Sequence, residues 1–134
     1  MPVGMMDPVA TLLESLRDID GVVGSFVLGG DGGLMAWDVP PPLTEATLDE
    51  IGQRIVRLAD MFDVVVGSDL RVCTIAFGTA KLFINRTAPG FLCILTDPRI
   101  QLTATRMAAT VVAREIQAEI RRHPLEIVRV GERP

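Results

Sequence analysis

The sequence predicts an α/β (α+β) domain built as a three-layer α/β/α sandwich, with helices on both faces of an antiparallel sheet. Two observations support this fold class. Helical and strand-like apolar patterns follow one another in the order helix, two strands, helix, three strands, helix. In addition, nearly continuous apolar strands such as FLCIL, at residues 91–95, need cover on both sides. A chain of 134 residues has the length of one domain, so we expect a single domain over residues 1–134.

Composition and charge favour a protein whose partners are other proteins. Hydrophobic residues make up 49% of the chain and the mean hydropathy is +0.37, which is high for a soluble monomer and favours an oligomer. No apolar run approaches the roughly 20 residues that span a bilayer, and the N-terminus lacks the features of a signal peptide. We therefore expect a cytoplasmic protein without a membrane span. The net charge of −4 argues against a nucleic-acid partner.

The first helix is marked at both ends. Asp7-Pro8 is a typical helix start, because the aspartate can accept a hydrogen bond from a free amide and proline needs no donor at the first helical position. Apolar residues then follow at helical spacing, and Gly21 can close the helix. The apolar positions are Val9, Leu12, Leu13, Leu16 and Ile19.

The sequence GGDGG at residues 29–33 has two interpretations, a phosphate-binding loop or a hairpin turn. A phosphate loop needs its glycines to lead into a helix, but these lead into LMAWDVPPP, which cannot begin one. Asp-Gly between two apolar runs is a strong hairpin signal. The pattern thus predicts strands at 22–28 and 34–39 joined by a tight turn, and Pro40, Pro41 and Pro42 then prevent further strand pairing.

The second helix follows the prolines. Thr44 and Thr47 are both candidate N-caps, and one face is apolar while the other is polar. The apolar face comprises Leu48, Ile51, Ile55, Leu58, Ala59 and Phe62, and the polar face comprises Glu50, Gln53, Arg57 and Asp60. Beside the apolar face, the small residues Gly52, Val56 and Ala59 form a shallow flank. This flank is either a place where another helix backbone approaches closely or simply part of a wide core stripe.

The second half of the chain predicts a meander and a closing helix. Strand candidates at 70–77, 81–87 and 91–96 are separated by the turns GTAK and TAPG, and a long helix follows over 99–122. A final run, LEIVRV at Leu125–Val130, alternates like an edge strand.

The residue types needed for catalysis do not cluster in the sequence. His123 is the only histidine and lies at a helix end, where a partly charged ring favours a structural role. Cys73 and Cys93 fall in apolar strands and are expected to be reduced core residues. Trp37 is either a core residue or, if its ring faces outward, an interface anchor. We expect no catalytic site, no metal site and no cofactor.

A leading helix, the stretch DGVVGSFVLGGDGGLMA at residues 20–36, a long second helix, a meander and a closing helix together resemble the Roadblock domain family. That family includes the Roadblock dynein light chains and the MglB-type regulators of small Ras-like GTPases. The most specific part is the Gly21-Val22 entry into a strand, the Asp31-Gly32 turn and the apolar second strand. The resemblance covers a core at residues 7–122 and leaves residues 123–134 as a tail.

The resemblance implies a profilin-like and longin-like fold with a five-stranded antiparallel sheet. It also implies dimers that pair through the second helix and the third strand, with a second copy of this chain or with a paralogue. The implied dimer interface includes Gly52, Val56, Ala59, Phe62, Leu70, Arg71, Val72 and Cys73.

The implied function is that of a non-enzymatic dimer that binds a small Ras-like GTPase and alters its GTP hydrolysis or nucleotide cycle. The paired second helices would form the platform, with Gln53, Arg54 and Arg57 as partner-binding candidates. The alternative is a structural dimerisation adaptor of the light-chain kind, which has no GTPase partner. The three prolines before helix two and the LEIVRV tail depart from the family pattern and leave the exact partner surface open.

Overall fold

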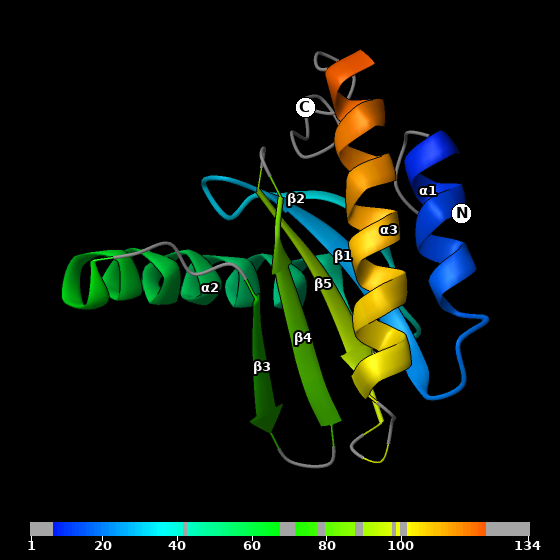
Figure 1. Ribbon diagram of the computed structural model, residues 1–134, viewed down its shortest axis with the longest axis horizontal. Helices are drawn as coiled ribbons and strands as arrows, with labels where there is room; N and C mark the ends of the chain where they lie inside the picture. Colours follow the sequence, from blue (N-terminus) through cyan, green and yellow to red (C-terminus); the bar gives the residue numbers. More distant parts are fainter. Residues whose placement is uncertain are drawn as a thin grey trace.

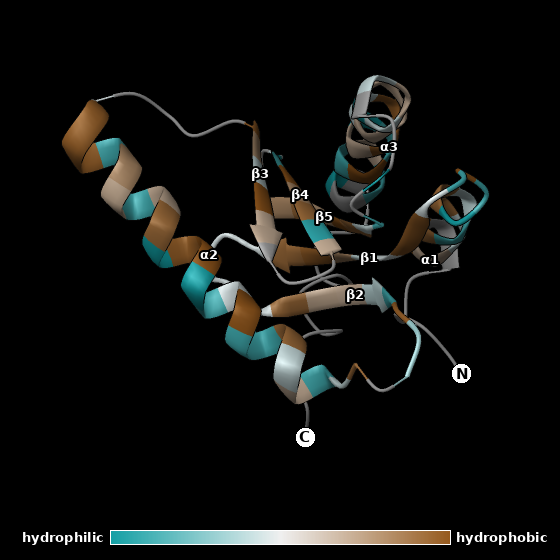
Figure 2. Cartoon of the chain, turned by 90° about the horizontal axis from the view of Figure 1, so that it is seen from below, coloured by the Kyte–Doolittle hydropathy of each residue, from teal (hydrophilic) through white to brown (hydrophobic). Residues whose placement is uncertain are grey.

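The computed structural model describes residues 7–41, 43–67, 72–77, 80–87, 90–97, 99 and 102–122. Within these residues it contains three helices and five strands in the predicted order. The elements are α1 (Asp7–Leu16), β1 (Val22–Gly29), β2 (Leu34–Asp38), α2 (Glu45–Val66), β3 (Val72–Phe77), β4 (Ala80–Arg86), β5 (Gly90–Thr96) and α3 (Leu102–Arg122). Figures 1 and 2 show α1 and α3 on one face of the sheet and α2 on the other. The three-layer α/β/α sandwich is confirmed.

The sheet has five strands in the order β2-β1-β5-β4-β3, and each neighbouring pair is antiparallel. Consecutive strands β3, β4 and β5 lie side by side, which confirms the predicted meander. Strand β5 is the last strand of this meander, and it pairs with β1 at the centre of the sheet. Strands β2 and β3 form the two edges.

Alternation along the strands divides the core into two clusters. Val27 faces α1 and α3, whereas its neighbours Phe26 and Leu28 face α2. The α1/α3 core includes Val9, Leu13, Leu16, Val27, Phe83, Leu92, Ile94, Ala109 and Ile116. The α2 core includes Phe26, Leu28, Leu34, Leu48, Ile55, Ala59, Leu82, Ile84, Phe91 and Cys93. Both faces of the central strands are therefore buried, as the apolar run 91–95 predicts.

The structure decides between the two candidate caps of α2. Thr44 has an extended backbone and its hydroxyl accepts a hydrogen bond from the backbone amide of Thr47 at 3.2 Å, so Thr44 is the N-cap. At the other end, Gly67 takes a left-handed conformation (φ 81°), and its amide donates to the carbonyl of Asp63. Helix α2 is therefore a full 22 residues long, with a defined start and stop.

The predicted hairpin turn is also confirmed. The Gly29 amide donates to the Gly33 carbonyl at 2.8 Å, and the carboxylate of Asp31 accepts from the Gly33 amide at 2.9 Å. Gly32 has a positive φ of 88°, which glycine adopts without strain. The glycines thus form a tight turn between β1 and β2.

Two helix boundaries differ from the sequence prediction. Helix α1 ends at Leu16, and the chain continues in tighter turns in which the amides of Arg17 and Ile19 bond to carbonyls three residues back. Ile19 lies outside the helix but still packs against the α1/α3 core. Helix α3 begins at Leu102 instead of residue 99. The predicted tail strand at Leu125–Val130 and His123 lie outside the described residues.

Candidate protein-interaction surface

The C-terminal part of α2 carries large apolar side chains that nothing in the described subunit covers. Val64 is 83% exposed and Val65 is 78% exposed, and Met61 and Val66 are also exposed. Figure 2 shows the reason: this end of the helix, coloured brown, projects past β3 at the edge of the sheet. Clustered apolar surface of this kind is typical of an interface with another protein.

Strand β3, past which this helix end projects, is an edge of the sheet. It pairs with β4, and no strand lies on its other side among the described residues. Its side chains alternate, because Cys73 and Ile75 pack against the α2 core whereas Val72, Thr74 and Ala76 are exposed on the opposite face. An edge with free backbone donors and acceptors can accept a further strand.

An ion pair connects the projecting helix to the sheet. The guanidinium of Arg86, at the end of β4, lies 3.7 Å from the Asp63 carboxylate of α2 and 5.4 Å from the centre of the Phe91 ring. The distance to Asp63 is too long for a hydrogen bond, and the buried Asp63 Oδ1 has no hydrogen-bond donor among the described residues. The pair therefore helps to orient the last turns of α2 by electrostatics alone.

The small flank of α2 faces its own subunit. Gly52 is buried, and a Cβ at this position would overlap the carbonyl oxygen of Gly32 in the β1–β2 turn. Ala59 is 1% exposed and belongs to the α2 core. At Gly52 the β1–β2 turn of the same subunit makes a close backbone approach. Gly52 and Ala59 thus have almost no surface left for a second subunit.

The other predicted interface residues lie where a second subunit could contact them. Val56 is partly buried beside Gly32, and Phe62 is partly exposed on the flank of α2. Val72 is 44% exposed and Cys73 is partly buried on β3. Leu70 and Arg71 lie outside the described residues.

The three candidate partner-binding residues are exposed along α2 but differ in their contacts. The Gln53 side-chain amide donates to the carbonyl of Asp31 at 3.3 Å and so supports the hairpin turn. Arg54 pairs with Glu50 one helical turn away at 3.3 Å. Arg57 has no ion-pair partner among the described residues.

Sequence reasoning missed the apolar end of α2. Met61 precedes Phe62, and the run Val64, Val65 and Val66 follows Asp63, so this helix is apolar around most of its circumference at its end. That change from an amphipathic pattern to an apolar one is a signal for a second buried face. It could have been read from the sequence.

The described residues show no arrangement suited to metal binding. No group of three His, Cys, Asp or Glu residues among them could hold a metal ion. Both cysteines are free, and burial raises the pKa of the Cys93 thiol far above its usual range, which keeps it protonated. Trp37 is partly buried and packs against both cores, in agreement with a core role. No helix in the described part of the chain has the length and apolarity to cross a membrane.

Comparison with solved structures identifies the fold. The structure resembles MglB of Myxococcus xanthus with a TM-score of 0.76 at 12% identity, covering 85% of this chain and 88% of that one. It resembles the Roadblock/LC7 domain from Streptomyces avermitilis with a TM-score of 0.71 at 13% identity, covering 83% and 96%. Profilin IA of Acanthamoeba castellanii matches with a TM-score of 0.58 at 19% identity, covering 83% and 94%. No protein-family model matches the sequence, and no curated protein is significantly similar to it.

These likenesses establish a Roadblock-type fold, related to that of profilin. Another similar structure is that of MglB with a tetrameric arrangement, so at least one protein of this fold assembles into oligomers.

Proposed function

We propose that this protein is a dimeric, non-catalytic regulator or scaffold that binds a small Ras-like GTPase in the cytoplasm and modulates its GTP hydrolysis or nucleotide cycle. The observation that carries the proposal is the exposed apolar end of α2, which projects past the open sheet edge at β3. The choice of a Ras-like GTPase as the partner comes from the family resemblance, and the similarity of the structure to MglB supports this choice.

In the proposed dimer, the β3 strands of two subunits pair and the sheet continues across the interface. Each α2 then packs against the second subunit through Met61, Phe62 and the three valines at its end. Val72 and Cys73 lie on the pairing strand, and Leu70 and Arg71 precede it directly. Gly52 and Ala59 affect this interface only indirectly, because they pack α2 against its own subunit. A stable interface buries about 1,600 Å² in total, which a helix and a strand from each subunit can supply.

The proposed GTPase platform is the outward side of α2. Arg57 is its most available cation, because Arg54 is paired with Glu50. Gln53, the third candidate, is uncharged and supports the hairpin turn. We assign Arg57 a contact with the partner protein and no role in the transfer of phosphate.

The function is tested by GTP hydrolysis. Purified Ras-like GTPases encoded in the same genome are assayed with and without this protein, and we expect one of them to bind and to change its hydrolysis rate. Arg57→Glu should remove the change while the dimer persists. Arg114→Glu, on the exposed face of α3, is the matched control and should leave the change in hydrolysis rate intact. Absence of both binding and a rate change for every GTPase tested would contradict the proposal.

One observation favours the alternative of a structural dimerisation adaptor. Two of the three candidate GTPase contacts, Gln53 and Arg54, already bond within the subunit. An adaptor needs only the dimer interface and a docking surface. Recovery of partners by affinity purification distinguishes the two functions, since an adaptor would return partners that include no GTPase.

A further inference from the structure

The described residues leave a part of the sheet on the α3 side uncovered. The exposed side chains of Val72, Thr74 and Ala76 lie on the same face as Phe83, which belongs to the α1/α3 core. Helix α3 packs over β4 and β5. We call the outward face of β3 and the adjoining start of β4 the β3 shelf. Its exposed side chains on β3 are the small residues Val72, Thr74 and Ala76.

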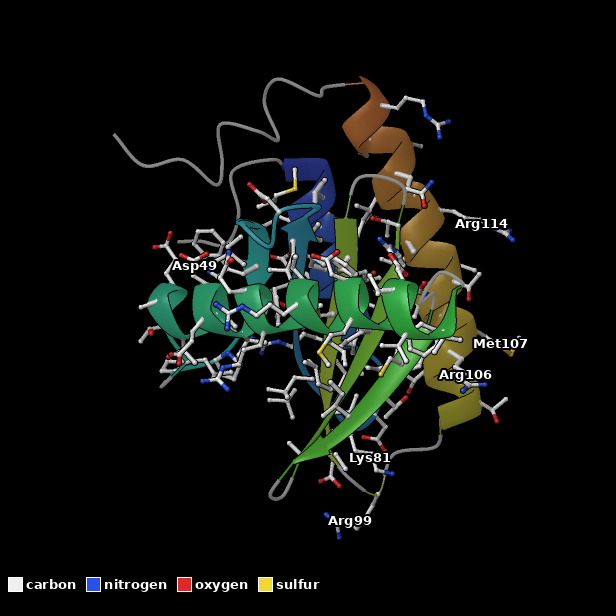
Figure 3. All side chains as sticks on the ribbon, turned by 90° about the vertical axis from the view of Figure 1, so that its left-hand side faces the viewer. Asp49, Lys81, Arg99, Arg106, Met107 and Arg114 are labelled. Atoms are coloured by element: carbon white, nitrogen blue, oxygen red, sulfur yellow. The ribbon has the colours of Figure 1, made fainter. Side chains whose placement is uncertain are left out.

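Two basic residues border the β3 shelf. Lys81 pairs in register with Ala76, so both side chains lie on the α3 side of the sheet. Arg106 is exposed in the first turns of α3. Figure 3 shows both residues on the α3 side, toward the end where β4 begins, whereas Asp49 lies on the opposite side.

Both charges are available for a ligand. Neither Lys81 nor Arg106 has an ion-pair partner among the described residues, while the nearby Arg99 is bound to Asp97 at 3.2 Å. A basic border is notable in a protein whose net charge is −4. The charge complementary to this surface is therefore negative.

The proposed dimer turns two shelves into one trough. If β3 pairs with the β3 of a second copy, both uncovered strands lie between α3 and its counterpart. Strands are about 4.8 Å apart, so an α3 centred over β4 and β5 lies roughly 19 Å from its counterpart, four strand spacings away. Packed helices lie about 8–10 Å apart, so a gap of this width accommodates one further helix in contact with both walls.

We infer that this trough binds a single helix of a partner protein, which has an apolar stripe and acidic residues toward both ends. The stripe lies on Val72, Thr74 and Ala76 of both subunits. Because the two β3 strands run in opposite directions, Lys81 and Arg106 occur at each end of the trough. One helix occupies the symmetry axis, so the stoichiometry is one helix per dimer. The inference rests on the dimer of the proposed function but not on the GTPase.

The probe is a synthetic peptide of about 18 residues, roughly 27 Å long as a helix, with leucines at helical spacing and glutamates near both ends. A matched peptide carries lysines in place of the glutamates. Fluorescence anisotropy with the full-length protein should show saturable binding of the acidic peptide at one per dimer, at least tenfold tighter than the basic one. The doubly substituted variant Lys81→Glu, Arg106→Glu should weaken it at least tenfold, and Thr74→Trp, which fills the floor, should do so too.

Arg57→Glu on α2 is the control and should bind the acidic peptide as the unsubstituted protein does. Equal affinity for both peptides, no binding, or insensitivity to charge reversal at Lys81 and Arg106 would overturn the inference. Sedimentation of the same samples separates the causes. A monomeric protein contradicts the dimer and with it the proposed function, whereas a dimer that fails to bind the peptide contradicts the trough alone.

Discussion

Gly32 of the β1–β2 turn and Gly52 of α2 bring two backbones into direct contact. A Cβ on Gly32 would lie 2.9 Å from the carbonyl oxygen of Gly52, and a Cβ on Gly52 would overlap the carbonyl oxygen of Gly32. The contact is supported on either side, because Gln53 donates to the Asp31 carbonyl and the Leu34 amide donates to Asp49 at 3.3 Å. The hairpin turn therefore sets where α2 lies on the sheet.

Gly52→Ala should destabilise the protein by about 1–3 kcal/mol, because the added methyl group forces the turn away from the helix. Denaturant unfolding followed by circular dichroism measures the change. Asp60→Ala, on the exposed side of the same helix, is the control and should remain within about 0.5 kcal/mol. Equal stability of Gly52→Ala and the unsubstituted protein would show that the turn does not rest on α2.

Val65→Asp and Val72→Asp should each give a folded monomer. Both side chains are exposed in the subunit, so the fold tolerates the charge, but an unpaired charge at the centre of an interface is costly. Sedimentation reports the assembly and circular dichroism the fold. Val111→Asp on exposed α3 should sediment as a dimer. If both interface variants remain dimeric, the surface is assigned wrongly.

Val56→Asp is unsuitable for this test of the dimer, since Val56 packs against the α2 core.

Thr44→Ala should cost about 1 kcal/mol, since the hydroxyl of Thr44 accepts the Thr47 amide and satisfies a free donor at the start of α2. Thr47→Ala retains that backbone amide and loses only a contact between two exposed hydroxyls. We therefore expect the smaller loss at Thr47 in the same unfolding measurement. The reverse order of the two losses would identify Thr47 as the functional cap.

The hydrogen bonds that the side chain and the backbone of Arg99 donate to Asp97 lower the pKa of this carboxyl. A lowered pKa means that the folded state binds the proton less readily than the unfolded chain. The associated stabilisation is thus present above the ordinary pKa of aspartate, about 3.9, and is lost as the pH falls through the folded value. In NMR titrations, Arg99→Ala should move the pKa of Asp97 back toward the ordinary value. An unchanged titration would exclude the side chain of Arg99 as the cause.

Much of the architecture could be predicted from local chemistry. The GGDGG turn, the proline exit and the two faces of α2 each depend on residues close together in the sequence, whose conformational preferences act locally. The predicted end of α1 was less accurate, because Ile19 packs against the core from a turn just as it would from a helix. The predicted start of α3 also differed from the observed start. Burial alone does not identify the conformation of the backbone.

The sequence by itself determined the order of the elements, the turn chemistry and which side chains of α2 share a face. Only the tertiary structure decided what each face meets. Helical periodicity specifies the angle of Gly52, Ala59 and Val66 around the axis, but not how far along that axis the sheet extends. Gly52 and Ala59 lie over the sheet and are buried, whereas Val66, on nearly the same side of the helix, lies past its edge and is exposed. The position of the β1–β2 turn against Gly52 sets that overhang, and it is a contact between residues distant in the sequence.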